Sequence, residues 1–335
     1  MEQLVIQETD YDAISSKIAC INKKYLPDPQ IFSVYPNYEL LYNSYFNELP
    51  KVTRRSYNKI KKLMSSNNYP IMNIGTYLRT VSIDHVLSLY LLPNSDNTEK
   101  NNHFQIINLG CGTDLRYFQY NHIYEERLER YIDVDFPMAI ETKGRVLSNL
   151  NKKNPSLFDL NDNGGSTDGK YQLMSFNLNR NTDELIKQLE LVGCDFSLKT
   201  IIITECCLCY IEDAKSIELI SKLNSVFNAK TNNLHWVSYD PIGGTDKFGQ
   251  IMTDNLLFQR NLKLPTLLTY NTKEKYSKRF SSIINSDISI KIEDMWEIFQ
   301  TKIPLKEKTR VQKCEFLDEL EELKIILSHY VILYF

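Results

Sequence analysis

The stretch His103–Asn121, "HFQIINLGCGTDLRYFQYN", decides the fold class. Its first part, Phe104–Leu109, is an apolar run typical of a strand, and this run breaks into Gly110, Cys111 and Gly112. Glycines placed directly after a strand let a ligand approach the backbone closely, because no side chain stands in the way. Two glycines alone also fit a plain turn. The third glycine of the dinucleotide fingerprint is missing, which counts against a nicotinamide-dependent oxidoreductase.

Strand-like and helix-like segments alternate after this stretch. Four more strands are predicted, at Arg130–Asp135, Tyr171–Phe176, Thr200–Glu205 and Leu234–Asp240. Helical or loop segments separate them, near 113–121, 137–152, 181–191 and 213–227. The run "TIIITE" is almost continuously β-branched, as expected for a strand buried on both faces of a parallel sheet. This order predicts an α/β fold with a doubly wound, mostly parallel sheet.

Both flanks of this alternating region differ from it. The polar loop "PNSDNTEKNN" separates a helical N-terminal portion, residues 1–95, from a core at 96–335. After about residue 240 the pattern changes to a turn-rich loop, "PIGGTDKFG", with helical stretches near 248–262 and 272–280. The tail "HYVILYF" is typical of a closing strand.

Composition excludes several classes of function. With 39 basic and 42 acidic residues the net charge is −3, so we expect no nucleic-acid partner. The apolar runs are too short to span a bilayer, and the N-terminal residues lack the apolar core of a signal peptide, so we expect a cytoplasmic protein without membrane contact. Cys206, Cys207 and Cys209 have no second group of ligands at a suitable spacing, and we expect no metal.

Polar residues close three of the predicted strands. Asp135 could accept both hydroxyls of an adenosine ribose, or it could be a helix cap or a structural aspartate. Because no pyrophosphate-binding motif is present, the ligand that fits is an adenosine-containing compound without a pyrophosphate, such as S-adenosylmethionine. Asn177 and Leu178 could flank its adenine ring, although they fit an ordinary loop as well. Glu205 could pair with an ammonium group or be a capping or salt-bridged residue.

Six blocks of sequence resemble the leucine carboxyl methyltransferase family: "NIGTYLRT", "NLGCGTDLR", "YIDVDFP", "ITECCLCY", "SYDPIGG…FGQIM" and "FLDELEEL". The resemblance covers nearly the whole chain. It implies the class I, Rossmann-like fold of S-adenosylmethionine-dependent methyltransferases. It also implies that the N-terminal helical extension contributes to the cofactor and substrate site and that the inserts form a substrate lid. The implied substrate is the C-terminal leucine α-carboxylate of the protein phosphatase 2A catalytic subunit, methylated by a monomer.

The resemblance also implies roles for individual residues. Those expected to bind the cofactor, which leaves as S-adenosylhomocysteine, are Lys17, Arg79, Gly110, Gly112, Asp135, Asn177, Leu178 and Glu205. Lys17 and Arg79 would hold its carboxylate or a nearby anion. Arg79 and Tyr210 are the expected catalytic residues, and Tyr210 would lie beside the substrate carboxylate. Family members usually carry Asp where this chain has Asn177.

This chemistry explains why no catalytic triad is found. A C-terminal carboxylate, with a reference pKa of about 3.5, is ionised at pH 7 and needs no general base. We therefore expect in-line methyl transfer in which Arg79 and Tyr210 orient the reactants and take no proton. Two alternatives share the predicted fold. One is a class I methyltransferase acting on a small-molecule carboxylate, and the other is a non-catalytic module that only binds a partner.

Overall fold

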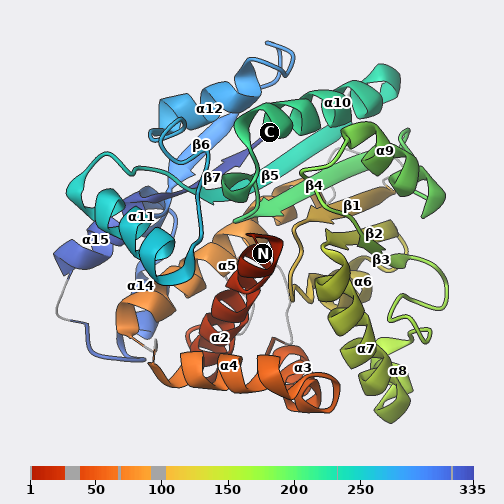
Figure 1. The fold of residues 1–335 in the computed structure, drawn as a ribbon, viewed down its shortest axis with the longest axis horizontal. Coiled ribbons are helices and arrows are strands. Elements are labelled where there is room, and N and C mark those ends of the chain that lie inside the picture. The colour runs from red at the N-terminus through yellow and green to blue at the C-terminus, as the bar shows by residue number, and fades with distance from the viewer. Residues whose placement is uncertain (1, 27–37, 67–68, 92–102, 232, 318–319) are drawn as a thin grey trace.

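A seven-stranded sheet forms the centre of the computed structural model, which describes residues 2–26, 38–66, 69–91, 103–231, 233–317 and 320–335 (Figure 1). The strand order is β3-β2-β1-β4-β5-β7-β6. The strands are β1 (Phe104–Leu109), β2 (Leu128–Asp135), β3 (Tyr171–Ser175), β4 (Lys199–Glu205), β5 (Leu234–Pro241), β6 (Lys291–Asp294) and β7 (Tyr330–Tyr334). The first five pair in parallel, whereas β7 is antiparallel to both β5 and β6.

The predicted strands are confirmed, β1 with the same bounds and the other four with ends that differ by one or two residues. The closing strand in the tail is confirmed as β7. The sequence prediction missed β6, because "KIED" is short and charged and has no apolar run. The carboxyl ends of β1, β2 and β4 meet at one edge of the sheet, which brings their polar terminal residues together.

Helices cover both faces of the sheet. Alternate residues of β4 point to opposite faces, so Ile201 and Ile203 belong to one apolar cluster and Ile202 to another. On the Ile202 face lie α9 (Thr182–Leu191), α10 (Asp213–Thr231) and α12 (Lys273–Ser281). On the opposite face lie α2 (Thr9–Asn22), α3 (Tyr38–Val52), α5 (Pro70–Leu91), α6 (Arg116–Tyr124), α7 (Pro137–Lys153), α13 (Met295–Thr301), α14 (Leu305–Gln312) and α15 (Leu320–Ser328). The sheet is therefore doubly wound, as predicted.

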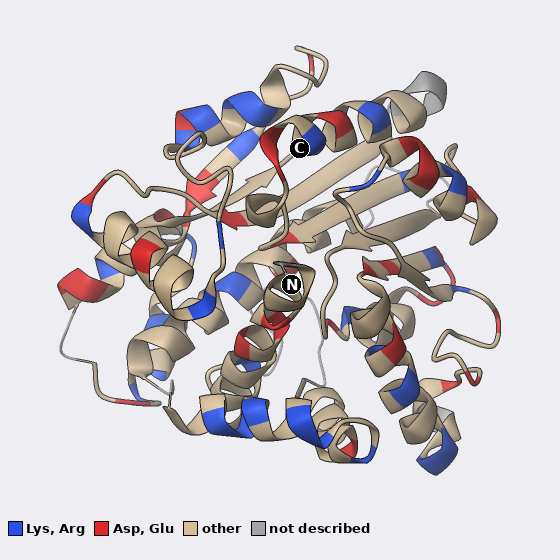
Figure 2. Cartoon of the chain, viewed as in Figure 1, with Lys and Arg blue, Asp and Glu red and all other residues tan. Residues whose placement is uncertain are grey.

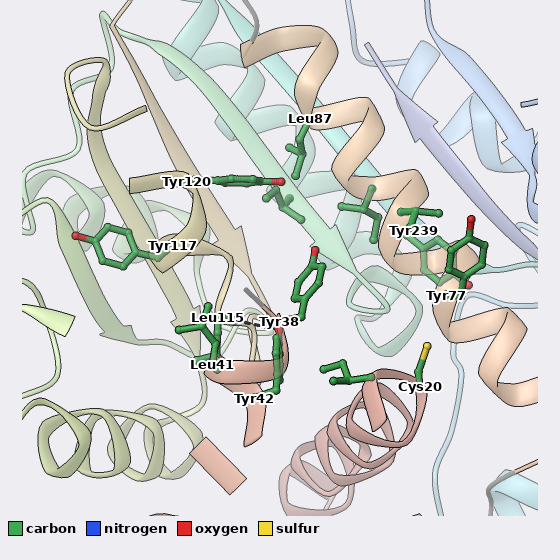
Figure 3. Packing of buried hydrophobic residues seen from close by; sticks show 14 of the residues in the cluster. Cys20, Tyr38, Leu41, Tyr42, Tyr77, Leu87, Leu115, Tyr117, Tyr120 and Tyr239 are labelled. Atoms are coloured by element: carbon green, nitrogen blue, oxygen red, sulfur yellow. Dashed lines mark hydrogen bonds between the residues drawn. The ribbon is translucent and has the colours of Figure 1, made fainter. Parts of the chain in front are cut away.

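Buried tyrosines join the N-terminal helices to the sheet (Figure 3). Tyr38 and Tyr42 from α3 and Tyr77 from α5 belong to the same apolar cluster as Tyr120 of α6 and Tyr239 of β5. The remaining helices are α1 (Glu2–Gln7), α4 (Arg54–Ser66), α8 (Pro155–Phe158), η1 (Leu208–Tyr210) and α11 (Lys247–Arg260). The division of the chain near residue 95 falls in 92–102, outside the described residues, and stays a prediction.

Charged residues of both signs are spread over the helices, whereas the central strands carry few of them (Figure 2). This distribution leaves the middle of the sheet to apolar packing. Among the described helices, none combines the length and the apolar composition that crossing a bilayer requires.

Candidate active site

A cavity of about 540 Å³ lies at the carboxyl ends of β1, β2 and β4. Its walls come from α2 and α5 on one side, from the loops that follow these strands, and from α11. All the predicted site residues line it: Lys17, Arg79, Gly110, Gly112, Asp135, Asn177, Leu178, Glu205 and Tyr210. The structure thus brings together residues from distant parts of the sequence, while their roles toward a ligand stay predictions.

The glycine-loop end of the cavity is formed by Gly110, Gly112, Thr113 and Asp135. Gly110 has φ +70° and Gly112 has φ +46°, a region that side chains disfavour. A Cβ at Gly110 would lie 2.7 Å from Cys207 Sγ. Both positions therefore require glycine, for conformation as well as for space.

Asp135 is tied to this loop. One of its oxygens accepts from Gly112 N at 2.7 Å, and the other accepts from Phe136 N at 2.6 Å. Burial raises the pKa of Asp135 to about 6, although both backbone hydrogen bonds oppose the shift. At pH 7 the carboxylate is ionised, and its spare lone pairs can accept hydroxyl groups.

Asp10 of α2 closes the loop from the other side, a contact that the sequence prediction missed. Thr113 donates to the Asp10 carboxylate through its backbone N at 2.8 Å and through its Oγ1 at 2.5 Å. A Cβ at Gly112 would overlap Asp10. Nothing in the polar N-terminal sequence marks this aspartate as a partner for a loop more than a hundred positions later.

Asn177 and Leu178 follow β3, and both are half-buried in the cavity wall. Asn177 Oδ1 accepts from Asn179 N at 3.0 Å, which fixes the carboxamide in a tight turn. Phe136 and Phe176 add apolar surface nearby in the lining. This part of the wall can hold a flat heterocycle, with one amide group available for hydrogen bonding.

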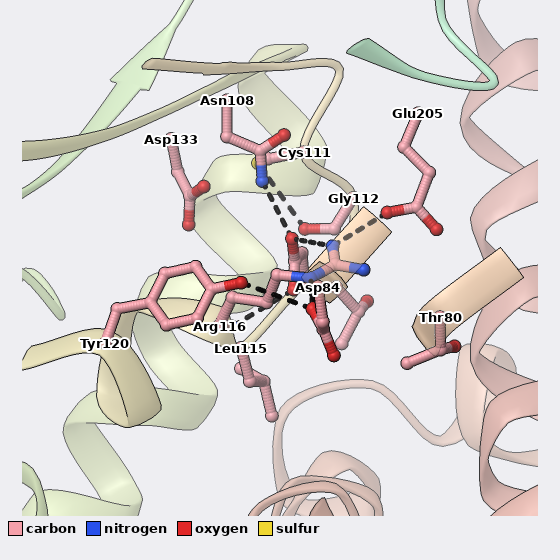
Figure 4. A network of polar contacts seen from close by, with 12 residues as sticks. Thr80, Asp84, Asn108, Cys111, Gly112, Leu115, Arg116, Tyr120, Asp133 and Glu205 are labelled. Atoms are coloured by element: carbon pink, nitrogen blue, oxygen red, sulfur yellow. Dashed lines mark hydrogen bonds and ion pairs between the residues drawn. The ribbon is translucent and has the colours of Figure 1, made fainter. Parts of the chain in front are cut away.

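The charged end of the cavity is formed by Lys17, Arg79, Asp114 and Glu205. Arg79 Nε donates to Glu205 Oε1 at 2.5 Å. Arg116 Nη1 donates to Glu205 Oε2 at 2.7 Å (Figure 4). Burial alone would raise the pKa of Glu205, but Arg116 and Arg79 outweigh it and hold the pKa well below its usual range. Glu205 is therefore an ionised carboxylate that faces the cavity.

Lys17 differs from the other buried cations because no described residue pairs with it. Its side chain is 9% exposed, and its ammonium lies 5.6 Å and 5.2 Å from the ring centroids of Tyr38 and Tyr42. No hydrogen bond or ion pair joins it to any residue in the described ranges. Desolvation, followed by the charge of Arg116, lowers its pKa. A ligand anion would supply the missing partner.

Tyr210 and part of α11 also line the cavity. Met252 and Leu256 of α11, together with Leu264, contribute apolar side chains to this lining, and α11 also contributes polar ones. Desolvation raises the pKa of Tyr210 well above its usual value, so the phenol stays protonated and can donate. At the rim, Arg260 of α11 forms a bidentate ion pair with Asp12 of α2. This pair links the segment after residue 240 to the N-terminal helices.

In the described part of the chain, the structure shows neither a cluster of metal ligands nor a histidine in the cavity wall. There, no group of three or more His, Cys, Asp or Glu side chains is arranged to hold a metal ion. No histidine is among the described lining residues.

This strand order, with a glycine loop after β1 and an acid at the end of β2, defines the fold of class I S-adenosylmethionine-dependent methyltransferases. A crystal structure of a protein assigned as a methyltransferase, from Thermobifida fusca, shares the fold with a TM-score of 0.50 at 11% identity, covering 87% of this chain and 92% of that one. The chain belongs to the leucine carboxyl methyltransferase family, whose sequence model matches residues 6–224.

Full-length relatives support the same assignment. Leucine carboxyl methyltransferase 1 of Kluyveromyces lactis is 38% identical, over 98% of this chain and 97% of the relative. The protein of that name from Eremothecium gossypii is 37% identical, over 98% of each chain. The one from Schizosaccharomyces pombe is 33% identical, over 97% of this chain and 92% of the relative. The resemblance predicted from the six sequence blocks is confirmed.

Proposed function

We propose that this protein uses S-adenosylmethionine to methylate the α-carboxylate of the C-terminal leucine of the protein phosphatase 2A catalytic subunit. One observation carries the proposal. A single cavity joins Asp135 and the glycine loop to a buried lysine without an ion-pair partner among the described residues and to a half-buried arginine–glutamate pair. Adenosine, an α-carboxylate and an α-amino group on one ligand match these features. Membership of a carboxyl-methylating family supports the reaction type.

The residues present fit this cofactor. The space in front of Gly110 and Gly112, which a Cβ would fill, admits close approach to the backbone. Asp135 would accept the ribose hydroxyls, Lys17 would hold the carboxylate and Glu205 would receive the ammonium. When bound, S-adenosylmethionine supplies a methyl group made electrophilic by its positively charged sulfur.

Orientation is the main task left to the protein. The leucine carboxylate, with a reference pKa of about 3.5, arrives ionised and needs no base. Arg79 would anchor it, at the cost of some nucleophilicity, and the Tyr210 hydroxyl would donate a hydrogen bond. Holding the carboxylate in line for displacement can lower the barrier by roughly 7–11 kcal/mol. We therefore assign catalysis to the alignment of the two reactants in the cavity.

Selectivity for one protein needs more than the cavity. Met252, Leu256 and Leu264 can receive a leucine side chain. Such a wall discriminates one methylene group by only about 1–3 kcal/mol. A docking surface around the rim of the cavity must supply the remaining selectivity. Helix α11 lies at this rim, and its Phe258 is 80% exposed.

Methyl transfer from labelled cofactor tests the proposal. The substrates are the full-length phosphatase 2A catalytic subunit, the same subunit without its terminal leucine, and a panel of small carboxylic acids. We expect alkali-labile label on the full-length subunit and none on the truncated one. Label on a small acid, with the phosphatase unlabelled, would instead support the small-molecule alternative. Label on neither would contradict the proposal.

A further inference from the structure

Arg116, the first residue of α6, lies directly behind the charged end of the cavity. It is 0% exposed and is not itself a lining residue. Its Nε donates to Asp84 Oδ1 at 2.9 Å, and its Nη1 donates to Asp114 Oδ2 at 2.6 Å and to Glu205 Oε2 at 2.7 Å (Figure 4). One buried cation thus joins three carboxylates, of which Asp114 and Glu205 face the cavity.

Two of these carboxylates are themselves fixed. Asp84 accepts from the Tyr120 hydroxyl at 3.2 Å and also from the hydroxyl of Tyr38. Asp114 accepts from Asn108 Nδ2 at 3.0 Å. The guanidinium is therefore held from behind, and its contact with Glu205 sets where that carboxylate lies. Glu205 in turn positions Arg79 through its other oxygen.

The charges of this region balance. Three cations and three carboxylates give a formal sum of zero: Lys17, Arg79 and Arg116 against Asp84, Asp114 and Glu205. A zwitterionic amino-acid group adds no net charge to such a site. Without Arg116, the uncompensated carboxylates would attract Lys17 and Arg79, the groups that a ligand carboxylate needs.

We propose that Arg116 is a positioning residue for the amino-acid end of the cofactor: it fixes the Glu205 carboxylate so that this carboxylate receives the α-amino group. Through Glu205 it also holds the Arg79 guanidinium in place. The inference rests on the proposed function, because it needs a ligand of the S-adenosylmethionine type. If the Arg116 ion pairs served stability alone, their loss would weaken the binding of every part of the ligand. If Arg116 is a positioning residue, its substitution reduces only the contribution that the α-amino group makes to the affinity.

Calorimetric titration of Arg116→Lys tests this difference, because lysine keeps the charge but lacks the planar fork that serves three carboxylates. The ligands are S-adenosylhomocysteine, an analogue without the α-amino group, and an analogue without the ribose 2′-hydroxyl. In the unaltered protein, we expect the missing amino group to weaken binding by about 10- to 100-fold. In Arg116→Lys this penalty should fall below about 3-fold, while the 2′-hydroxyl penalty stays unchanged.

Arg279→Lys is the matched control. Arg279 is also buried, but it donates to the Leu208 carbonyl and to Ser216 Oγ and makes no contact with Glu205, so both penalties should persist. If circular dichroism shows Arg116→Lys to be unfolded, Asp84→Asn loosens Arg116 from behind and should reduce the amino-group penalty alone. An unchanged amino-group penalty in a folded variant would overturn the inference. Absence of binding to the unaltered protein would instead overturn the proposed function, and this inference with it.

Discussion

At the glycine-loop end of the cavity, the contacts come mostly from one stretch, 110–136, and most donors are backbone groups. At the charged end, the groups come from α2, α5, the loop after β1, α6 and β4, and every principal contact involves a formal charge. The first end depends on local chain geometry, whereas the second depends on several buried charges balancing one another. Because unpaired buried charges are costly, we expect substitutions at the charged end to have larger effects.

The largest effect is expected for Arg79→Ala. This change removes the proposed anchor for the substrate carboxylate and leaves Glu205 with Arg116 as its remaining arginine partner. Loss of a group that orients charge in an active site costs about 100- to 1,000-fold in turnover. Initial rates of methyl transfer would measure it, with the exposed Arg54→Ala on α4 as the control. Turnover within twofold of the unaltered protein, with normal cofactor affinity, would remove Arg79 from the site.

A smaller but clear loss is expected for Gly112→Ala. The new Cβ would overlap Asp10. The alanine would also have to keep the positive φ of Gly112, which costs about 1–3 kcal/mol. We expect a lower melting temperature and weaker binding of S-adenosylhomocysteine. Gly75→Ala in α5 is the matched control for the melting temperature alone, because its Cβ would meet no protein atom within 4 Å but Gly75 lines the cavity. That change should be stabilising by about 0.5–1 kcal/mol. Equal melting temperatures for the two variants would contradict this account of the loop.

The two ends also differ in how far the sequence predicts them. Strand, glycines and Asp135 follow one another within 104–135, so their spacing indicated most of the glycine-loop end, although it missed Asp10. Arg116 lies in the same stretch, but the sequence predicted no role for it. Its partners Asp84 and Glu205 lie on elements that only the fold brings together. An arginine at the start of a helix is ordinarily solvated, and no local pattern reveals that this one is buried.

The pH dependence of binding should separate the ends further. As pH falls through about 6, Asp135 becomes protonated and loses its ability to accept both ribose hydroxyls. At pH 5 about one tenth of it is ionised, so affinity for S-adenosylhomocysteine should be about tenfold lower than at pH 7.

Unfolding caused by protonation of Asp135 cannot explain this fall in affinity. A raised carboxyl pKa means that the folded state binds the proton more tightly than the unfolded state, so this group favours folding as the pH falls. Calorimetry at several pH values would measure the affinity. Asp135→Asn should bind S-adenosylhomocysteine more weakly at pH 7, and its affinity should no longer fall between pH 7 and pH 5. If the affinity of the variant still fell over this range, a group other than Asp135 would be titrating.

The smallest effect is expected for Asn177→Asp, at the position where we expect members of the family to carry Asp. The carboxylate would keep the hydrogen bond from Asn179 N and would accept more strongly from an adenine amino group. Because the site is half-buried and partly solvated, we expect about two- to fivefold tighter binding of S-adenosylhomocysteine. Asn181→Asp, which adds the same charge at an exposed position nearby that does not line the cavity, should leave affinity unchanged. A tenfold or greater gain would mean that this end also depends on formal charge, and the contrast with the charged end would fail.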